Sequence, residues 1–109
     1  MSKDSPMLRI HAARGGSAYT LRLSGELDFS SVKLLEGELD RIERSDAEHL
    51  VVDLGALEFI DSGGMASLLR AALRSAQDSN RLQMRRSDHR AVQRLLVLAG
   101  IEKYLPFID

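Results

Sequence analysis

The chain has 109 residues, of which 44% are hydrophobic and 28% are charged, and its formal net charge is −1 at pH 7. This length and composition predict one globular domain with a single core. The absence of cysteine excludes disulfides and thiolate metal sites and favours a reducing compartment. The apolar runs are much shorter than the roughly 20 residues that span a bilayer, and the first residues lack the apolar core of a signal peptide, so we expect a cytoplasmic protein without membrane contact.

The first quarter of the chain predicts a flexible end followed by a β-hairpin. Residues 1–7 are polar and are expected to be flexible, whereas 8–109 are expected to form the domain. Alternation of apolar and polar residues predicts strands over 8–13 and 18–25. Because the glycine-containing segment 15–17 joins these strands as a short turn, they are expected to pair in antiparallel fashion.

A helix and a central strand are predicted next. Apolar residues recur at helical spacing over 32–44, which predicts an amphipathic helix. The hydroxyl group of Ser30 or Ser31 is expected to cap its first turn. The continuous apolar run 49–54 predicts a central strand that is buried on both faces, and 55–59 is expected to be a connection.

The second half of the chain predicts a helix, a strand and a further helix. The ranges are 63–78 for the first helix, 81–86 for the strand and 88–99 for the last helix. Ser87 is expected to cap the last helix, and Gly100 is expected to end it in the left-handed conformation. The apolar side of the helix over 63–78 is expected to comprise six residues: Met65, Leu68, Leu69, Ala72, Leu73 and Ala76.

The closing segment is expected to pack Leu105 and Phe107 back onto the body. The element order is therefore β-β-α-β-α-β-α. It predicts an α/β fold with a small mixed β-sheet of about four strands, an antiparallel first hairpin and helical crossovers.

Charge is distributed unevenly, because the first half of the chain is net acidic and the second half is net basic. Five arginines within 81–94 raise the possibility of a nucleic-acid surface: Arg81, Arg85, Arg86, Arg90 and Arg94. Aromatic residues make up 5% of the chain, and apolar residues alternate with these arginines. This pattern is more typical of a solvated face, so we expect no direct binding to nucleic acid.

The stretch IDSGG at 60–64 joins the predicted central strand to a helix and carries the strongest candidate site. A serine-hydrolase elbow requires GxSxG, and residue 60 is isoleucine. The glycines match neither a phosphate-binding P-loop nor the GxGxxG fingerprint, and histidines and carboxylates show no metal-ligand spacing. We therefore expect no catalytic residue, no metal and no cofactor.

A structural interpretation of Ser62 survives these exclusions. Its hydroxyl group is expected to cap the following helix by accepting from the N–H of Gly64 or Met65. Capping leaves Gly63 and Gly64 unexplained, because glycine weakens the first turn of a helix. We interpret the two glycines as residues that expose the serine and permit close approach by another protein.

Three segments resemble the STAS domains, and within them the single-domain anti-sigma factor antagonists of the SpoIIAA type. GELDFSS at 25–31 is similar to the family segment that opens the first helix. LVVDLGALEFIDSGGMASLLRA at 50–71 is similar to the family's most recognisable stretch, and LLVLAGIEKYLPF at 95–107 resembles its closing helix and tail. The resemblance implies the SpoIIAA-like fold and a regulatory protein that is not an enzyme.

The resemblance also implies a mechanism. Ser62 corresponds to the serine that a partner, an anti-sigma factor with GHKL-type serine kinase activity, phosphorylates with ATP. The unphosphorylated protein would bind that partner and release a sigma factor, with a PP2C-type phosphatase as a further partner and a monomer or weak dimer as its own state. The implied partner-binding residues are Asp28, Ser31, Asp61, Ser62, Gly63, Gly64, Met65 and Ser67.

The sequence leaves two points open. Asp28 is interpreted equally well as a partner contact or as a polar cap near Ser31. Gly63 stands where the family often has a second hydroxyl residue, and Met65 replaces a branched residue, so the identity of the partner is not determined. An alternative function is that of a STAS adaptor subunit in a larger assembly, such as a lipid-exporting ABC transporter or a sensory complex, without phosphoswitching.

Overall fold

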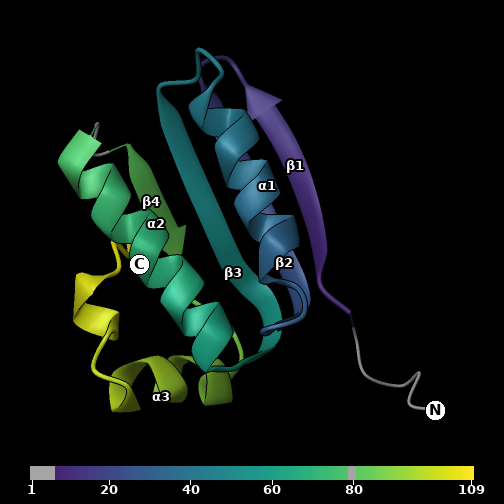
Figure 1. Cartoon of the computed structure of the whole chain (residues 1–109), viewed down its shortest axis with the longest axis vertical. Coiled ribbons are helices and arrows are strands. Elements are labelled where there is room, and N and C mark those ends of the chain that lie inside the picture. Colours follow the sequence, from purple (N-terminus) through teal and green to yellow (C-terminus); the bar gives the residue numbers. More distant parts are fainter. Residues whose placement is uncertain (1–6, 79–80) are drawn as a thin grey trace.

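The computed structural model describes residues 7–78 and 81–109 (Figure 1). The strands are β1 (Arg9–Gly15), β2 (Ala18–Leu27), β3 (His49–Ile60) and β4 (Leu82–Arg85). The helices are α1 (Val32–Glu43), α2 (Ser62–Asp78), α3 (Arg90–Leu98) and the short 3-10 helix η1 (Glu102–Tyr104). The order of strands and α-helices is the predicted one, β-β-α-β-α-β-α. The expectation of a flexible end over 1–7 falls, for residues 1–6, outside the described residues.

The four strands form one mixed sheet in the order β1-β2-β3-β4. β1 and β2 are antiparallel, with Arg9 opposite Ser24, which confirms the predicted hairpin. β2 pairs with β3, and β3 with β4, in parallel fashion. Because parallel neighbours need a crossover connection, α1 and α2 provide the two crossovers between these strands.

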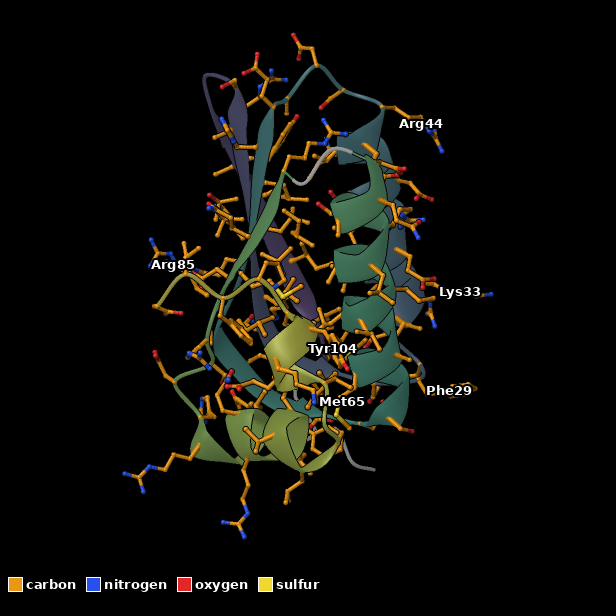
Figure 2. The ribbon with its side chains drawn as sticks, turned by 90° about the vertical axis from the view of Figure 1, so that its left-hand side faces the viewer. Phe29, Lys33, Arg44, Met65, Arg85 and Tyr104 are labelled. Atoms are coloured by element: carbon orange, nitrogen blue, oxygen red, sulfur yellow. The ribbon has the colours of Figure 1, made fainter. Side chains whose placement is uncertain are left out.

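The helices lie on one side and at one end of the sheet. α1 and α2 pack over the same face, and α3 lies across the end where β3 finishes (Figures 1 and 2). The core between them consists mainly of leucine side chains, among them Leu21, Leu23, Leu35, Leu54 and Leu68, each no more than 1% exposed. No helix in the described ranges combines the length and the hydropathy needed to cross a membrane.

The central position predicted for β3 is confirmed, but its predicted burial on both faces is wrong. Leu50, Val52 and Leu54 are buried, whereas Val51 and Asp53, which alternate with them, are only half-buried. The reason is that α1 and α2 cover the same face and leave the other without a helix (Figure 2). The apolar sequence of this strand therefore did not show whether helices cover both faces of the sheet or only one.

The predicted connection over 55–59 is also wrong, because β3 continues through it to Ile60. Ser24 pairs with Ala56, and Leu27 pairs with Ile60, across register shifts in the β2–β3 ladder. Gly55 and Ala56 have low strand propensity, and pairing with β2 overrides that local preference. The longer strand places the start of α2 beside the end of β2.

The helix α2 packs partly through the predicted apolar residues and partly through small residues that were not predicted. Its buried residues are Gly64, Ser67, Leu68, Ala71 and Ala72. Of the residues assigned to the apolar side, Leu68 and Ala72 are buried as predicted and Met65 and Leu69 are half-buried, whereas Leu73 is 49% exposed and Ala76 is exposed. Small residues on the buried face allow the helix backbone to approach the sheet closely, so the packed face is rotated away from the face that hydrophobicity alone predicts.

The start of α3 differs from the prediction. The helix begins at Arg90 after His89, and Ser87 lies outside it. The Ser87 hydroxyl group donates to the carbonyl oxygen of Leu57 at 2.8 Å and accepts from the N–H of His89 at 2.9 Å. Ser87 therefore joins the segment before α3 to β3 instead of capping the helix.

The end of α3 and the closing segment agree with the sequence. Gly100 has a φ of 75°, and the N–H of Ile101 donates to the carbonyl oxygen of Leu96 at 3.1 Å, which is the expected left-handed ending. Leu105 is buried, and Phe107 is half-buried and forms a bridge with Met84. The segment therefore packs back onto the body, as predicted, and it lies beside β4.

Candidate functional site

Two loops meet where β2 and β3 end. The β2–α1 loop contains Asp28 to Ser31, and the junction of β3 with α2 contains Asp61. Since Leu27 and Ile60 are register partners in parallel strands, the residues after them are delivered to the same edge of the sheet. The N–H of Asp61 donates to the carbonyl oxygen of Leu27 at 3.3 Å and joins the two loops directly.

Asp61 caps α2 and holds the neighbouring loop with the same carboxylate. Its Oδ1 accepts from the N–H of Gly64 at 2.9 Å, and its Oδ2 accepts from the N–H of Phe29 at 3.0 Å. Its carbonyl oxygen accepts from the N–H of Met65 at 2.9 Å, which is the first bond of the helix. The prediction that Ser62 caps the helix is therefore wrong, because the preceding residue also has a capping side chain and occupies that position.

Ser62 is the first residue of α2, and its hydroxyl group does not take part in capping the helix. The residue is exposed. Its hydroxyl group forms no hydrogen bond with any of the described residues. The N–H of Gly64, which the hydroxyl group was expected to bind, donates to Asp61 instead. The first N–H groups of a helix have no partner within the helix, so a negative charge on this side chain would be stabilised there.

The two glycines after Ser62 have different structural roles. A Cβ on Gly64 would lie 2.3 Å from the carbonyl oxygen of Leu27 and 2.8 Å from Cγ1 of Ile60, so this glycine is required for the packing of α2 on the sheet. A Cβ on Gly63 would lie 3.2 Å from Cα of Phe29. Gly64 is buried, so its absent side chain serves internal packing and not access to Ser62.

The Asp28 loop is fixed by its own side chains. Oδ1 of Asp28 accepts from the N–H of Ser30 at 3.0 Å and from its hydroxyl group at 2.8 Å. The Ser31 Oγ accepts from the N–H of Asp28 at 2.9 Å and donates to the carbonyl oxygen of Glu26 at 3.1 Å. Ser31 occupies the N-cap position of α1, but its hydroxyl group makes no capping bond. Its role is to hold the loop.

Hydrogen bonding makes Asp28 more acidic. The Ser30 hydroxyl group is the largest of the causes that lower the pKa of the Asp28 carboxyl group, with smaller contributions from Ser31 and backbone N–H groups. Asp28 is therefore ionised at neutral pH. The loop thus presents a fixed negative charge next to Asp61.

Replacement of Ser30 by alanine is expected to raise the pKa of Asp28, because the carboxylate loses its strongest hydrogen-bond donor. A lowered folded-state pKa stabilises the fold above the unfolded value of about 3.9, and that contribution is lost as the pH falls through the folded value. The advantage of wild type over Ser30→Ala should therefore disappear in acid. NMR titration of the Asp28 carboxyl carbon measures the pKa, with Ser45→Ala, at the far end of α1, as the control.

The eight residues implied in partner binding divide into two groups. Asp28, Asp61, Ser62, Gly63 and Met65 are exposed or half-buried, whereas Ser31, Gly64 and Ser67 are buried. The Ser67 Oγ is buried and has no hydrogen-bond partner among the described residues. Partner binding stays a prediction for the whole set, and the buried members contribute to it only by placing the exposed ones.

The structure adds Phe29 to the candidate site. Its side chain is 81% exposed, and Figure 2 shows it projecting beside the first turn of α2. Phe29 was not among the residues expected at the site, although an aromatic side chain in a polar loop between Asp28 and Ser30 was a visible signal. In the described part of the chain, no group of three or more His, Asp or Glu side chains is arranged to hold a metal ion.

The fold and the site define an α/β domain of the STAS class, with a serine at the start of α2 beside the β2–α1 loop. Residues 10–108 match the family model described as "Mlab, STAS domain". An anti-sigma F factor antagonist from Paenibacillus polymyxa is 30% identical over 103 residues, which cover 94% of this chain and 87% of that protein. The chain belongs to the STAS domain family.

Solved structures share the fold. An anti-sigma factor antagonist from Mycobacterium paratuberculosis superposes with a TM-score of 0.79 at 22% identity, covering 93% of this chain and 85% of that one. SpoIIAA in its unphosphorylated form gives a TM-score of 0.69 at 16% identity, covering 94% and 89%. The phosphorylated form of SpoIIAA from Bacillus gives 0.62 at 15% identity, covering 94% and 92%. The predicted SpoIIAA-like fold is therefore confirmed.

Proposed function

We propose that this chain is an anti-sigma factor antagonist controlled by phosphorylation of Ser62. The unphosphorylated form binds an anti-sigma factor, which frees a sigma factor, and phosphorylation ends the binding. The observation that carries the proposal is the exposed Ser62 hydroxyl group at the first position of α2, next to the Asp28 loop. The name of the Paenibacillus polymyxa relative supports the same role.

The fold is suited to accept a phosphate at Ser62. A phosphoserine carries about −1.5 to −2 charge at pH 7, and the start of a helix stabilises negative charge. Asp61 already caps α2 through the N–H of Gly64, so the helix does not depend on the Ser62 hydroxyl group. Phosphorylation is therefore expected to leave the domain folded.

Phosphorylation of Ser62 is expected to release the partner because it introduces charge repulsion into the interface. A kinase that modifies Ser62 must hold the phosphates of ATP against this hydroxyl group in the complex. A phosphate on Ser62 would then meet those negative charges and the Asp61 carboxylate in a partly desolvated contact, which can cost several kcal/mol. The switch acts on the interface and not on the fold.

The chemical steps belong to other proteins. The partner, an anti-sigma factor with GHKL-type serine kinase activity, binds ATP and transfers its terminal phosphoryl group to the Ser62 oxygen. A PP2C-type phosphatase would hydrolyse the phosphoserine and restore binding. In this proposed mechanism, the chain itself needs no cofactor and catalyses no reaction.

A binding titration tests the proposal. The unphosphorylated protein is titrated by calorimetry into each kinase-type anti-sigma factor encoded in the same genome, alone and bound to its sigma factor. We expect one partner to bind with a Kd of about 1 μM or tighter, or about −8 kcal/mol, and to release its sigma factor. Failure to bind every candidate, with folded protein on both sides, contradicts the proposal.

A second function is favoured by one observation. The matching family model is described as "Mlab, STAS domain", and that description does not refer to sigma factors. The second role that we propose is that of a STAS adaptor subunit in a larger assembly, such as a lipid-exporting transporter. Co-purification with membrane components, together with full function of Ser62→Ala in cells, would favour this role, because an adaptor without phosphoswitching does not need the hydroxyl group.

A further inference from the structure

We propose that Phe29 is the principal anchor of the docking surface, and that its ring enters an apolar pocket on the partner beside the site that receives Ser62. This inference rests on the proposed function and extends it to the chemistry of the partner. The partner is a protein whose pocket is lined by aliphatic or aromatic side chains and carries Lys or Arg on the side that faces Asp28.

The exposure of Phe29 is the first observation. At 81% it is the most exposed of the large hydrophobic side chains in the described part of the chain. A fully buried aromatic side chain contributes about 150–250 Å² of contact, and aromatic residues, phenylalanine among them, are enriched in protein interfaces. The ring is absent from the core cluster, so its removal leaves the packing of this domain intact.

The loop that carries Phe29 is held in place, which is the second observation. Its N–H donates to Oδ2 of Asp61 at 3.0 Å, and the next residue, Ser30, donates to Asp28. The absent Cβ of Gly63 would lie 3.4 Å from Cβ of Phe29, so the loop rests on the first turn of α2. A side chain on a fixed backbone loses less conformational freedom on binding, which increases the affinity that it provides.

The surroundings of Phe29 are the third observation. A single exposed apolar residue is common on protein surfaces. Here, however, Phe29 lies next to Gly63, which follows Ser62, and beyond Asp28 the surface opens into a cavity of about 200 Å³ that Leu34 helps to line. Leu34 is 57% exposed. Phe29 is therefore accompanied by a second exposed apolar side chain, Leu34, in the first turn of α1.

The charge beside the ring indicates the chemistry of the partner. Asp28 follows β2 immediately before Phe29 and uses only Oδ1 in hydrogen bonds with described residues, so Oδ2 is open. A carboxylate at the rim of an apolar contact is complemented by a cation. The partner is therefore expected to place Lys or Arg against Asp28, beside the pocket that receives the ring.

Replacement of Phe29 by alanine tests the inference. We expect Phe29→Ala to raise the Kd for the partner at least about 30-fold, which is the loss that defines a hot-spot residue, and to unfold at the wild-type temperature. Phe29→Leu should lose less, because it keeps apolar contact. Tyr104→Ala is the matched control, because Tyr104 is an aromatic residue 56% exposed on η1 and away from Phe29, and its replacement should leave the Kd unchanged (Figure 2).

The outcomes separate this inference from the proposed function. If Phe29→Ala binds as tightly as wild type while Ser62→Asp fails to bind, the anchor is overturned and the phosphoswitch stands. An equal loss in Phe29→Ala and Tyr104→Ala would overturn the specific role of Phe29. If wild type binds none of the candidate partners, both proposals are overturned.

Discussion

Replacement of Ser62 by aspartate is expected to weaken partner binding by at least about 100-fold, or about 2.7 kcal/mol, whereas Ser62→Ala binds as wild type does. Aspartate places a permanent negative charge at the exposed first position of α2, next to Asp61. Alanine removes the phosphate acceptor but adds no charge, so Ser62→Ala should stay bound in the presence of ATP. Calorimetric titration with and without ATP measures both effects.

Two controls accompany the Ser62→Asp and Ser62→Ala variants: their unfolding temperatures, and a variant that carries a negative charge elsewhere on α2. Both variants should unfold near the wild-type temperature, because Asp61 and not Ser62 caps α2. Gln77→Glu adds the same charge at the exposed far end of α2 and should leave binding unchanged. Large and equal losses of stability in both Ser62 variants would show that the serine is structural, and would contradict an interface switch.

Replacement of Gly64 by alanine is expected to lower the free energy of unfolding by about 3 kcal/mol. The new Cβ would lie 2.3 Å from the carbonyl oxygen of Leu27, which belongs to the backbone of β2 and has no alternative rotamer. Relief of the clash requires α2 to move off the sheet, and this movement also strains the Asp61 cap and the Phe29 loop. Urea denaturation followed by circular dichroism measures the change.

Gly37→Ala is the matched control for Gly64→Ala. Gly37 lies in α1, is exposed, and has no atom within 4 Å of the position of an added Cβ. Alanine there should raise the free energy of unfolding by about 0.5–1 kcal/mol, because alanine has the higher helix propensity. The same substitution is thus expected to have opposite signs at the two glycines. A stabilising effect at Gly64 would contradict the close contact between α2 and β2.

The order of the elements was predictable because each depends on local periodicity and on turn residues. The hairpin at Gly16, the helix over 32–44 and the left-handed ending at Gly100 all follow from short-range preferences. The extension of β3 to Ile60 did not follow, because Gly55 and Ala56 favour a loop locally. Their strand conformation comes from pairing with β2, which is a contact distant in sequence.

The capping interaction expected at the candidate site was assigned to the wrong residue. The stretch around Ser62 was identified, but capping was assigned to the serine when Asp61 has an equally suitable side chain. Sequence gives no means of choosing between two adjacent capping residues, and the carboxylate prevails because it also bonds the N–H of Phe29. That second bond depends on the parallel pairing of β2 with β3.

The packed face of α2 shows a similar limit. Leu68 is buried as hydrophobicity predicts, but Leu73 is exposed, and the small residues Gly64, Ser67 and Ala71 are buried in addition. Small side chains are favoured where the helix backbone lies close to the backbone of the sheet. The spacing of apolar residues along the sequence does not indicate such positions. Phe29 was not predicted, because hydrophobic periodicity identifies apolar residues that face the core and not one that is exposed on a loop.

The most direct test of the account is the binding of the phosphoprotein itself. The chain is incubated with ATP and the partner identified by titration, the phosphate is located by mass spectrometry, and the purified phosphoprotein is titrated against the same partner. The account predicts one phosphate, on Ser62, an affinity at least about 100-fold weaker than that of the unmodified chain, and an unchanged unfolding temperature. Phosphate at another residue, or a phosphoprotein that binds as tightly as the unmodified chain, would contradict it.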